Sequence, residues 1–514
     1  MALTVRLLNA TLVAIALMAT PGCGGIGAIP LTQTTTQIAS LSMSAVDAAV
    51  KAAAASVSEP MVIAVVDRSG NILAIYHKSG SPTTGIGNFG AVVRADELAV
   101  GLARTAAFFT NNQAPLSSRT VRFISGIHFP PGVSNTPSAA LYGIENTNRG
   151  CGFNVTFAPG KAVPPARSID NTTTGLGIIT GKADNLDSDP TAVNPGGVPL
   201  FARDETTGGI EAVGGIGVVA ARSDVAEFAA FTAAGGPPLL LTVPPPGAVL
   251  IDGIALPFVA QTTQPTGTST GTADGAYVLG PMKSPGPVPE GDLVPAHDGP
   301  MGGLTAAEVQ KIVDQAVATA NQTRAVIRLP LGQRARMVIA VVDLDGSLLA
   351  LNRMPDATVF SIDVAVAKAR NMIYFNSSAV SPLDLPGVPV GTAVTNRTIS
   401  FGAQPLFPSG IDGSQPGPFF PLYVNDIAHP CTQGSQPANA NQSGIVFFPG
   451  SEGLYRNGQL IGGLGVSGDG VEQDDYVTAG GASGFEPPAN IRADQVLIRG
   501  VRLPYLKFPR NPTQ

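Results

Sequence analysis

Four histidines are the side chains of this sequence best suited to bind a metal ion, because a neutral imidazole is a common metal ligand. They are His77, His128, His297 and His429. His77 stands at the end of a predicted strand, where it could bind a metal ion or an anion; the alternative is an exposed strand-end residue. His128 and His429 lie in long loops, and His297 lies in a segment rich in Gly and Pro. The sequence has no H-E-x-x-H, G-x-S-x-G or phosphate-loop motif, which argues against hydrolases and kinases.

Three arginines could bind a carboxylate through the planar fork of the guanidinium group. Arg104 and Arg370 each follow an alanine in a stretch with helical spacing, and Arg353 has the same place in its half of the chain as His77. The alternative is that the helix arginines are solvated or structural. Together with His77 as the metal ligand, these arginines make up the predicted ligand-binding set.

The segments that must position these residues occur twice. The sequence MVIAVVD is found at Met61–Asp67 and at Met337–Asp343, and in both copies a Gly and a second apolar stretch follow. A β-branched run, then Asp-x-x-Gly, then more apolar residues is typical of two antiparallel strands joined by a tight turn. A repeated core hairpin predicts a duplicated domain.

The similarity between the halves continues beyond the hairpin. Ala95–Phe109 and Ser361–Phe375 both have apolar residues at helical spacing, and the segment ending in Phe258 is echoed by the one ending in Tyr505. The sequence therefore predicts an α+β fold (α/β sandwich-like) with two tandem domains, each a central antiparallel sheet flanked by helices. The long loops at 111–194 and 376–448 exceed the usual loop length, and we expect them to hold strands or partner contacts.

Composition sets the domain boundaries. With 514 residues and 44% apolar content, the chain can form two ordinary cores. We predict an export signal at 1–30, a first domain at 31–260, a semi-extended Gly/Pro-rich linker at 261–303 and a second domain at 304–514. A net charge of −6 without a Lys/Arg cluster indicates no nucleic-acid partner.

The N-terminus predicts export to the periplasm or the cell surface. Arg6 precedes an apolar run at Leu7–Met18 that is too short to span a bilayer, and Gly22-Cys23 follows. Gly before Cys is similar to the bacterial lipoprotein cleavage site, so Cys23 is a predicted lipidation site and the lipid would be the chain's only membrane contact. The alternative is ordinary signal cleavage nearby.

The other two cysteines, Cys151 and Cys431, lie in equivalent loops of the two halves. In an exported protein they could form a disulfide, which would restrict the unfolded chain by about 4 kcal/mol for so long a loop. Two free thiols or an intermolecular bridge remain alternatives.

Several of the repeated segments together resemble the GlcG/HbpS-like family, also called the haem-degrading domain family. They are Asp343–Ala357, Lys368-Ala-Arg370 and Gly462–Gly468 in the second half, and Pro195–Leu200 and Gly214–Val218 in the first. The resemblance implies domains of profilin-like shape that assemble as homo-oligomers, with haem as the expected cofactor. The first half departs from the family by having His77 where the family commonly has Arg, and the second by having Pro449-Gly-Ser-Glu-Gly in place of the full Pro-Gly-Gly-Val-Pro that begins at Pro195.

Three functions from different classes follow from these observations. The first is an exported binding protein for haem or another small anionic ligand, which we favour. The second is a cell-surface structural or assembly protein without catalysis. The third is a haem-degrading enzyme, which only the family resemblance suggests, since no catalytic constellation is visible.

Overall fold

The first half of the chain forms a five-stranded antiparallel sheet with the strand order β5-β6-β1-β2-β9. The strands are β1 (Met61–Asp67), β2 (Ile72–Lys78), β5 (Gly197–Arg203), β6 (Ile210–Ala220) and β9 (Gly275–Leu279). Its helices are α1 (Met43–Ser56), α2 (Ala95–Phe109) and α4 (Ser223–Ala234). The computed structural model describes residues 40–151, 167–170, 174–187, 189, 191–204, 207–241 and 249–514.

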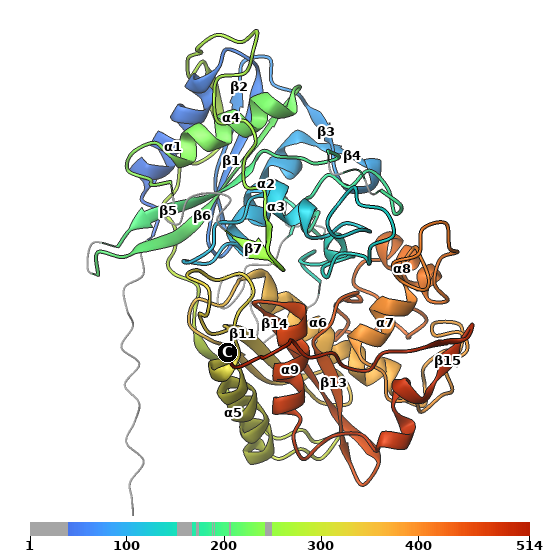
Figure 1. Cartoon of the computed structure of the whole chain (residues 1–514). Helices are drawn as coiled ribbons and strands as arrows, with labels where there is room; N and C mark the ends of the chain where they lie inside the picture. The colour runs from blue at the N-terminus through green and yellow to red at the C-terminus, as the bar shows by residue number, and fades with distance from the viewer. Residues whose placement is uncertain are drawn as a thin grey trace, which may run out of the picture. The chain divides into compact units, whose positions relative to one another are not determined.

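Helices cover both faces of this sheet because the side chains of β1 alternate between them. Val62, Ala64 and Val66 pack with α2, whereas Ile63 and Val65 pack with α1 and α4. Figure 1 shows α1 and α4 side by side over the sheet. Because every residue of β1 is buried, the repeated segment is apolar up to its final Asp.

The second half repeats this arrangement with the strand order β10-β12-β11-β14-β13. The strands are β10 (Gly291–Val294), β11 (Met337–Val342), β12 (Leu348–Arg353), β13 (Ser451–Arg456) and β14 (Gln459–Gly468). The helices are α5 (Ala306–Gln322), α6 (Phe360–Phe375) and α9 (Val471–Gly481). α6 packs on β14 and β11, and α5 lies beside α9 (Figure 1). The predicted α+β class, with antiparallel sheets flanked by helices, is confirmed.

The two hairpins have the same register. Val62 pairs with His77, and Val338 pairs with Arg353. Each hairpin also carries an irregularity at the same point, between Val65 and Val66 in the first half and between the two corresponding valines of β11 in the second. His77 and Arg353 therefore hold the same position in the two sheets.

Glycines in β6 and β14 let a helix backbone lie directly on the sheet. A Cβ at Gly217 would lie 1.9 Å from the carbonyl oxygen of Ala99 in α2, and one at Gly465 would lie 2.0 Å from that of Ala365 in α6. No side chain fits in that space. The repeated glycine motifs are thus helix-packing sites.

The predicted linker contributes the outermost strand of each sheet. β9 pairs with β2 of the first sheet, and β10 pairs with β12 of the second. Both strands of this segment therefore have hydrogen-bonded neighbours.

The long loops hold helices rather than strands, apart from isolated bridges, over the residues described. In the described parts of 111–194 and 376–448, short helices begin at capping boxes: Ser117 with Thr120, and Thr395 with Thr398. The helices are α3 (Ser118–Phe123), η2 (Ile144–Asn146), α7 (Asn396–Gly402) and α8 (Phe420–Ala428).

These loops contact each other across the two halves. A disulfide joins Cys151 to Cys431, with 5.1 Å between the Cα atoms. The rings of Tyr142 and Tyr423 pack with centroids 4.9 Å apart. The two long loops are therefore joined to each other both covalently and by packing.

Smaller elements complete the chain. They are the hairpins β3 (Thr84–Ile86) with β4 (Val92–Arg94), β7 (Leu250–Ile251) with β8 (Ile254–Ala255) and β15 (Leu497–Ile498) with β16 (Val501–Arg502), and the short helices η1 (Asn88–Gly90), η3 (Ala489–Ile491) and η4 (Ala493–Gln495). None of the described helices is long and apolar enough to cross a membrane. The predicted export signal and Cys23 lie outside the described residues.

Candidate functional site

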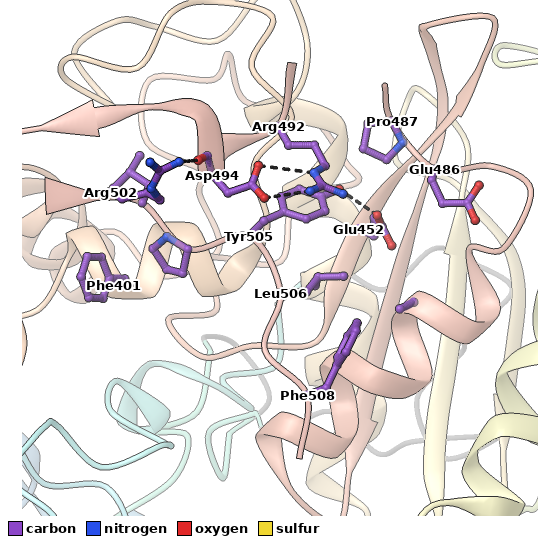
Figure 2. A pocket seen from close by; sticks show the side chains of 13 residues that line it. Phe401, Glu452, Glu486, Pro487, Arg492, Asp494, Arg502, Tyr505, Leu506 and Phe508 are labelled. Carbon is purple, nitrogen blue, oxygen red and sulfur yellow. Dashed lines mark hydrogen bonds and ion pairs between the residues drawn. The ribbon is translucent and has the colours of Figure 1, made fainter. Parts of the chain in front are cut away.

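A cavity of about 570 Å³ opens beside β13 of the second half, within the usual range for small-ligand pockets of about 300–1,000 Å³. β13, α7, α9 and the C-terminal segment contribute its walls (Figure 2). Its apolar lining residues are Phe401, Ala479, Pro487, Leu503, Pro504, Leu506 and Phe508. Its polar lining residues are Glu452, Glu486, Arg492, Asp494, Arg502 and Tyr505. An apolar wall with a few polar groups suits an amphiphilic ligand.

Glu452 and Tyr505 form the buried polar centre of this cavity. The phenol of Tyr505 donates a hydrogen bond to Oε1 of Glu452 over 2.8 Å. The capping box of α7 holds the tyrosine in place: the Thr395 hydroxyl donates to the Tyr505 carbonyl over 2.5 Å, and the Thr398 hydroxyl to the Pro504 carbonyl over 2.7 Å. The helix start thus fixes the C-terminal segment against the sheet.

The environment of Glu452 favours its neutral, protonated form. Its side chain is buried, with 3% of the residue exposed. Burial raises the pKa of Glu452 to about 8; the Tyr505 hydrogen bond opposes this shift, whereas Glu486 and Asp475 add to it. Its second oxygen, Oε2, has no hydrogen-bond partner among the described residues. A buried polar atom without a partner marks a place where a ligand or a water can bind.

Arginines provide the positive charge of the cavity. The Arg492 guanidinium forms an ion pair with Asp494, with Nη2 2.8 Å from Oδ2, and lies 5.2 Å from the ring centre of Tyr505. The hydrogen bond to Asp494 raises the pKa of Arg492. Arg502 donates to the backbone carbonyl of Asp494 over 2.8 Å, which turns this loop toward the cavity (Figure 2). Arg492 remains about one-third exposed and can take a second anionic partner.

The corresponding positions of the first half are apolar. In the first half, Gly217 of β6 pairs with Ala64 on one side and Gly197 on the other. In the second half, Gly465 of β14 pairs with Ala340 and Ser451 in the same way. Gly197 therefore corresponds to Ser451, and the next residue, Val198, corresponds to Glu452.

The partner of Glu452 differs in the same way. Ser117 donates to the carbonyl of Phe258 as Thr395 donates to that of Tyr505, so Phe258 corresponds to Tyr505. Core packing is satisfied by Val and Phe at these places. The Glu–Tyr pair is therefore a feature that the second half has beyond the needs of the fold.

The predicted ligand-binding residues do not come together at this cavity. Arg104 donates to the carbonyls of Gly70 and Arg167, over 3.0 and 2.8 Å. Arg370 donates to the Gly346 carbonyl over 2.9 Å in the same way. Burial lowers the pKa of both arginines to about 10. Each helix arginine therefore holds the turn of its own hairpin. This is the structural role that the sequence analysis gave as the alternative to ligand binding.

Arg353 and His77 are also engaged elsewhere. Arg353 donates to the Ala357 carbonyl over 3.0 and 2.6 Å and lies 3.3 Å from Glu290. His77 Nε2 lies 2.6 Å from Oδ1 of Asp96, with about a third of its side chain exposed. The two share a sheet position but not a common site.

The other histidines are not among the residues that line the cavity. His128 Nε2 is 3.2 Å from Asp412, a contact between the two long loops, and the rings of His297 and His429 each form a hydrogen bond with the backbone carbonyl of a nearby residue. Over the described residues, no group of three or more His, Cys, Asp or Glu side chains could hold a metal ion.

The sequence contains a signal for the Glu–Tyr pair. When the Pro-Gly segments at Pro195 and Pro449 are aligned, Glu452 corresponds to Val198, and when the Leu-Pro segments that precede Phe258 and Tyr505 are aligned, Tyr505 corresponds to Phe258. A change from apolar to polar at two positions of an otherwise matching repeat indicates a site in one copy.

Comparison with known families identifies the second half. Residues 304–483 match the model of a family described as "Haem degrading protein HbpS-like". This part of the chain is a GlcG/HbpS-like domain. The matched residues of the HbpS-like domain include Glu452, and the segment that carries Arg492 and Tyr505 follows them. No curated protein matches the chain.

The chain is also similar to several solved structures. A Klebsiella pneumoniae protein called ORFY is 21% identical, with 35% of this chain and 90% of that chain covered and a TM-score of 0.23. The PduOC:Heme complex is 24% identical, with 35% and 93% covered and a TM-score of 0.23. A double mutant of HbpS from Streptomyces reticuli is 17% identical, with 35% and 86% covered and a TM-score of 0.21.

Proposed function

We propose that the chain is a binding protein for haem or another amphiphilic carboxylate and that the cavity beside β13 holds the ligand. The observation that carries the proposal is the pair of Glu452 and Tyr505, which lies in a cavity of the HbpS-like domain at positions where the first half has Val198 and Phe258. The description of the matched family supports haem as the first ligand to test.

The residues that line the cavity support a tetrapyrrole as the ligand. Phe401, Leu506 and Phe508 offer apolar contacts to a planar ring, and Arg492 and Arg502 offer positive charge to its carboxylates. We further propose that the first half is a second GlcG/HbpS-like copy that supports the binding domain without a ligand site of its own.

A fluorescent reporter locates the ligand. The chain has no Trp, so Phe508→Trp places a single indole at the cavity, and Phe228→Trp in α4 places a matched one in the first half. Haemin is titrated into each variant, and binding is followed by equilibrium dialysis and by quenching of the indole. We expect saturable binding of one haemin with strong quenching at position 508 and weak quenching at 228. Absence of saturable binding contradicts the function, and equal quenching contradicts the site.

We also propose that the protein is exported and anchored through a lipid on Cys23. The apolar run at Leu7–Met18 and Gly22-Cys23 support this proposal. Expression of the whole chain and of Cys23→Ala in a bacterial host, followed by membrane fractionation, tests it. A lipidated chain sediments with membranes and the variant does not; equal distribution of the two contradicts lipidation.

A further inference from the structure

We propose that the cavity recognises a carboxylate of its ligand, held between Glu452 and Arg492, and that it offers no axial ligand to a metal ion. This inference rests on the proposed function and adds the chemical class, which is amphiphilic carboxylates with or without iron. Iron-free porphyrins should then bind with an affinity similar to that of haem.

The lining offers iron only one side chain of a suitable type. Haem iron is held by His, Cys, Met or Tyr, and Tyr505 is the only one of these among the residues that line the cavity. Its hydroxyl already donates to Glu452. Burial raises the pKa of Tyr505 well above its ordinary value, and the neighbouring Glu452 and Tyr455 add to this effect, so the phenolate that binds iron is disfavoured. Tyr505 instead positions Glu452.

In its protonated form, Glu452 can donate a hydrogen bond to a carboxylate of the ligand. Oε1 accepts from Tyr505, which leaves Oε2 as the place of the proton in the neutral acid. A protonated carboxyl donates to a carboxylate, and this charge-assisted bond is stronger than one between neutral groups. The guanidinium of Arg492, which lies over the Tyr505 ring, balances the charge of the ligand.

The groups around Glu452 keep this arrangement at neutral pH. Two of them are acids and oppose ionisation of Glu452, whereas Arg492 favours ionisation but is paired with Asp494. The titratable neighbours are Tyr455 on β13, Asp475 on α9, Glu486 and Arg492 in the loops around η3, and Tyr505 in the C-terminal segment. Above its pKa of about 8, Glu452 becomes an anion that repels a ligand carboxylate.

The first experiment compares haemin, iron-free protoporphyrin and haemin dimethyl ester on the whole chain by equilibrium dialysis. We expect haemin and protoporphyrin to bind with dissociation constants within about threefold of each other, and the ester at least about tenfold more weakly, since masking the carboxylates removes a charge-assisted contact. A preference of more than about tenfold for haemin over protoporphyrin would mean that iron is ligated and would overturn the proposal.

The second experiment measures protoporphyrin affinity from about pH 7 to about pH 9. The wild-type affinity should fall about tenfold across this range, because Glu452 ionises near pH 8. In Glu452→Gln the amide donates at every pH, so the affinity should stay constant. Asp426→Asn is the matched control: Asp426 is a buried carboxyl with a pKa of about 8 outside the cavity, so this variant should keep the wild-type profile.

The outcomes separate this inference from the proposed function. Failure of every porphyrin to bind at any pH refutes the proposed function, and the inference with it. Binding that does not change with pH, or that keeps its pH dependence in Glu452→Gln, refutes the inference alone. An affinity that rises with pH would mean that ionised Glu452 faces a positively charged group of the ligand. That result would also refute the inference. The wild-type pH profile is informative even if a variant does not fold.

Discussion

Arg68 and Asp356, 288 residues apart in the sequence, form an ion pair with Nη2 3.1 Å from Oδ1. Arg68 lies in the turn after β1, and Asp356 follows β12, so the pair joins the two halves of the chain. Arg328 contributes a second contact, with Nη1 2.7 Å from Oδ2 of Asp356. Burial acts to raise the pKa of Asp356, but the two arginines outweigh it and hold that pKa below its ordinary value.

Removal of Arg68 should destabilise the protein, since it leaves the largely buried Asp356 with less compensating charge. We expect Arg68→Met to lower the free energy of unfolding by about 2–4 kcal/mol at neutral pH, measured by urea denaturation. Because the depressed pKa favours the folded state above the unfolded pKa, this loss should shrink as the pH falls and Asp356 takes up a proton.

An exposed ion pair serves as the control. Arg222 and Asp224 are 2.5 Å apart with 45% and 37% of their side chains exposed, and Arg222→Met should leave the free energy of unfolding nearly unchanged. Similar losses for both variants would show that the contact between the halves contributes no more than a surface pair.

Substitution of glycine by alanine should destabilise the protein by different amounts in two of its hairpin turns. Gly70 and Gly253 both have positive φ, 86° and 80°, but a Cβ at Gly70 would lie 2.6 Å from the ring of Phe108, whereas one at Gly253 would meet nothing within 4 Å. Gly253→Ala should cost about 1–2 kcal/mol from the backbone alone. Gly70→Ala should cost about 1–3 kcal/mol more, because the ring must move. Equal midpoints in thermal denaturation would contradict the contact with Phe108.

The sequence predicted the repeated sheet well, because the apolar runs around Met61 and Met337 are decided by burial on both faces. β9 and β10 could not be predicted in the same way. Segments such as Gly275–Leu279 are hydrogen-bonded to a neighbouring strand on one side only, and one of their faces is exposed. They therefore lack the long buried apolar run that identifies the central strands in the sequence. The partner strand, which is distant in sequence, determines their conformation.

The site was harder to predict than the fold. Glu452 and Tyr505 are 53 residues apart and meet only because the capping box at Thr395 fixes the C-terminal segment. Conversely, Arg104 and Arg370 have the residue type of ligand-binding groups, yet their places in the two copies are equivalent and both hold a turn. Residue type alone could not separate these roles.

The disulfide between Cys151 and Cys431 should stabilise the contact between the long loops. It spans 280 residues, so the double variant Cys151→Ala/Cys431→Ala should lose up to about 5–6 kcal/mol in the chain-entropy model. Urea denaturation with and without a reducing agent tests this. The wild type should fall to the level of the double variant on reduction, and the double variant should not respond. A wild type that is unaffected by complete reduction would contradict the stabilisation.

Ionisation of Glu452 should make the stability of the protein depend on pH. Since burial raises its pKa to about 8, the folded chain keeps a proton on Glu452 at pH values where the unfolded chain, with an ordinary pKa near 4.3, has released it. Stability from this group is complete below the unfolded pKa and is lost as the pH rises toward about 8. Gln at this position has no such dependence.

The unfolding free energy of Glu452→Gln relative to wild type should therefore increase between about pH 5 and about pH 9, by a few kcal/mol. Asp474, with a pKa of about 7, and Asp426, with one of about 8, also titrate in this window. They do so in both proteins, so their contributions cancel in the difference. Denaturation curves across this range provide the measurement. A difference that stays constant with pH would show that Glu452 is ionised in the folded protein and would remove the hydrogen-bond donor from the cavity.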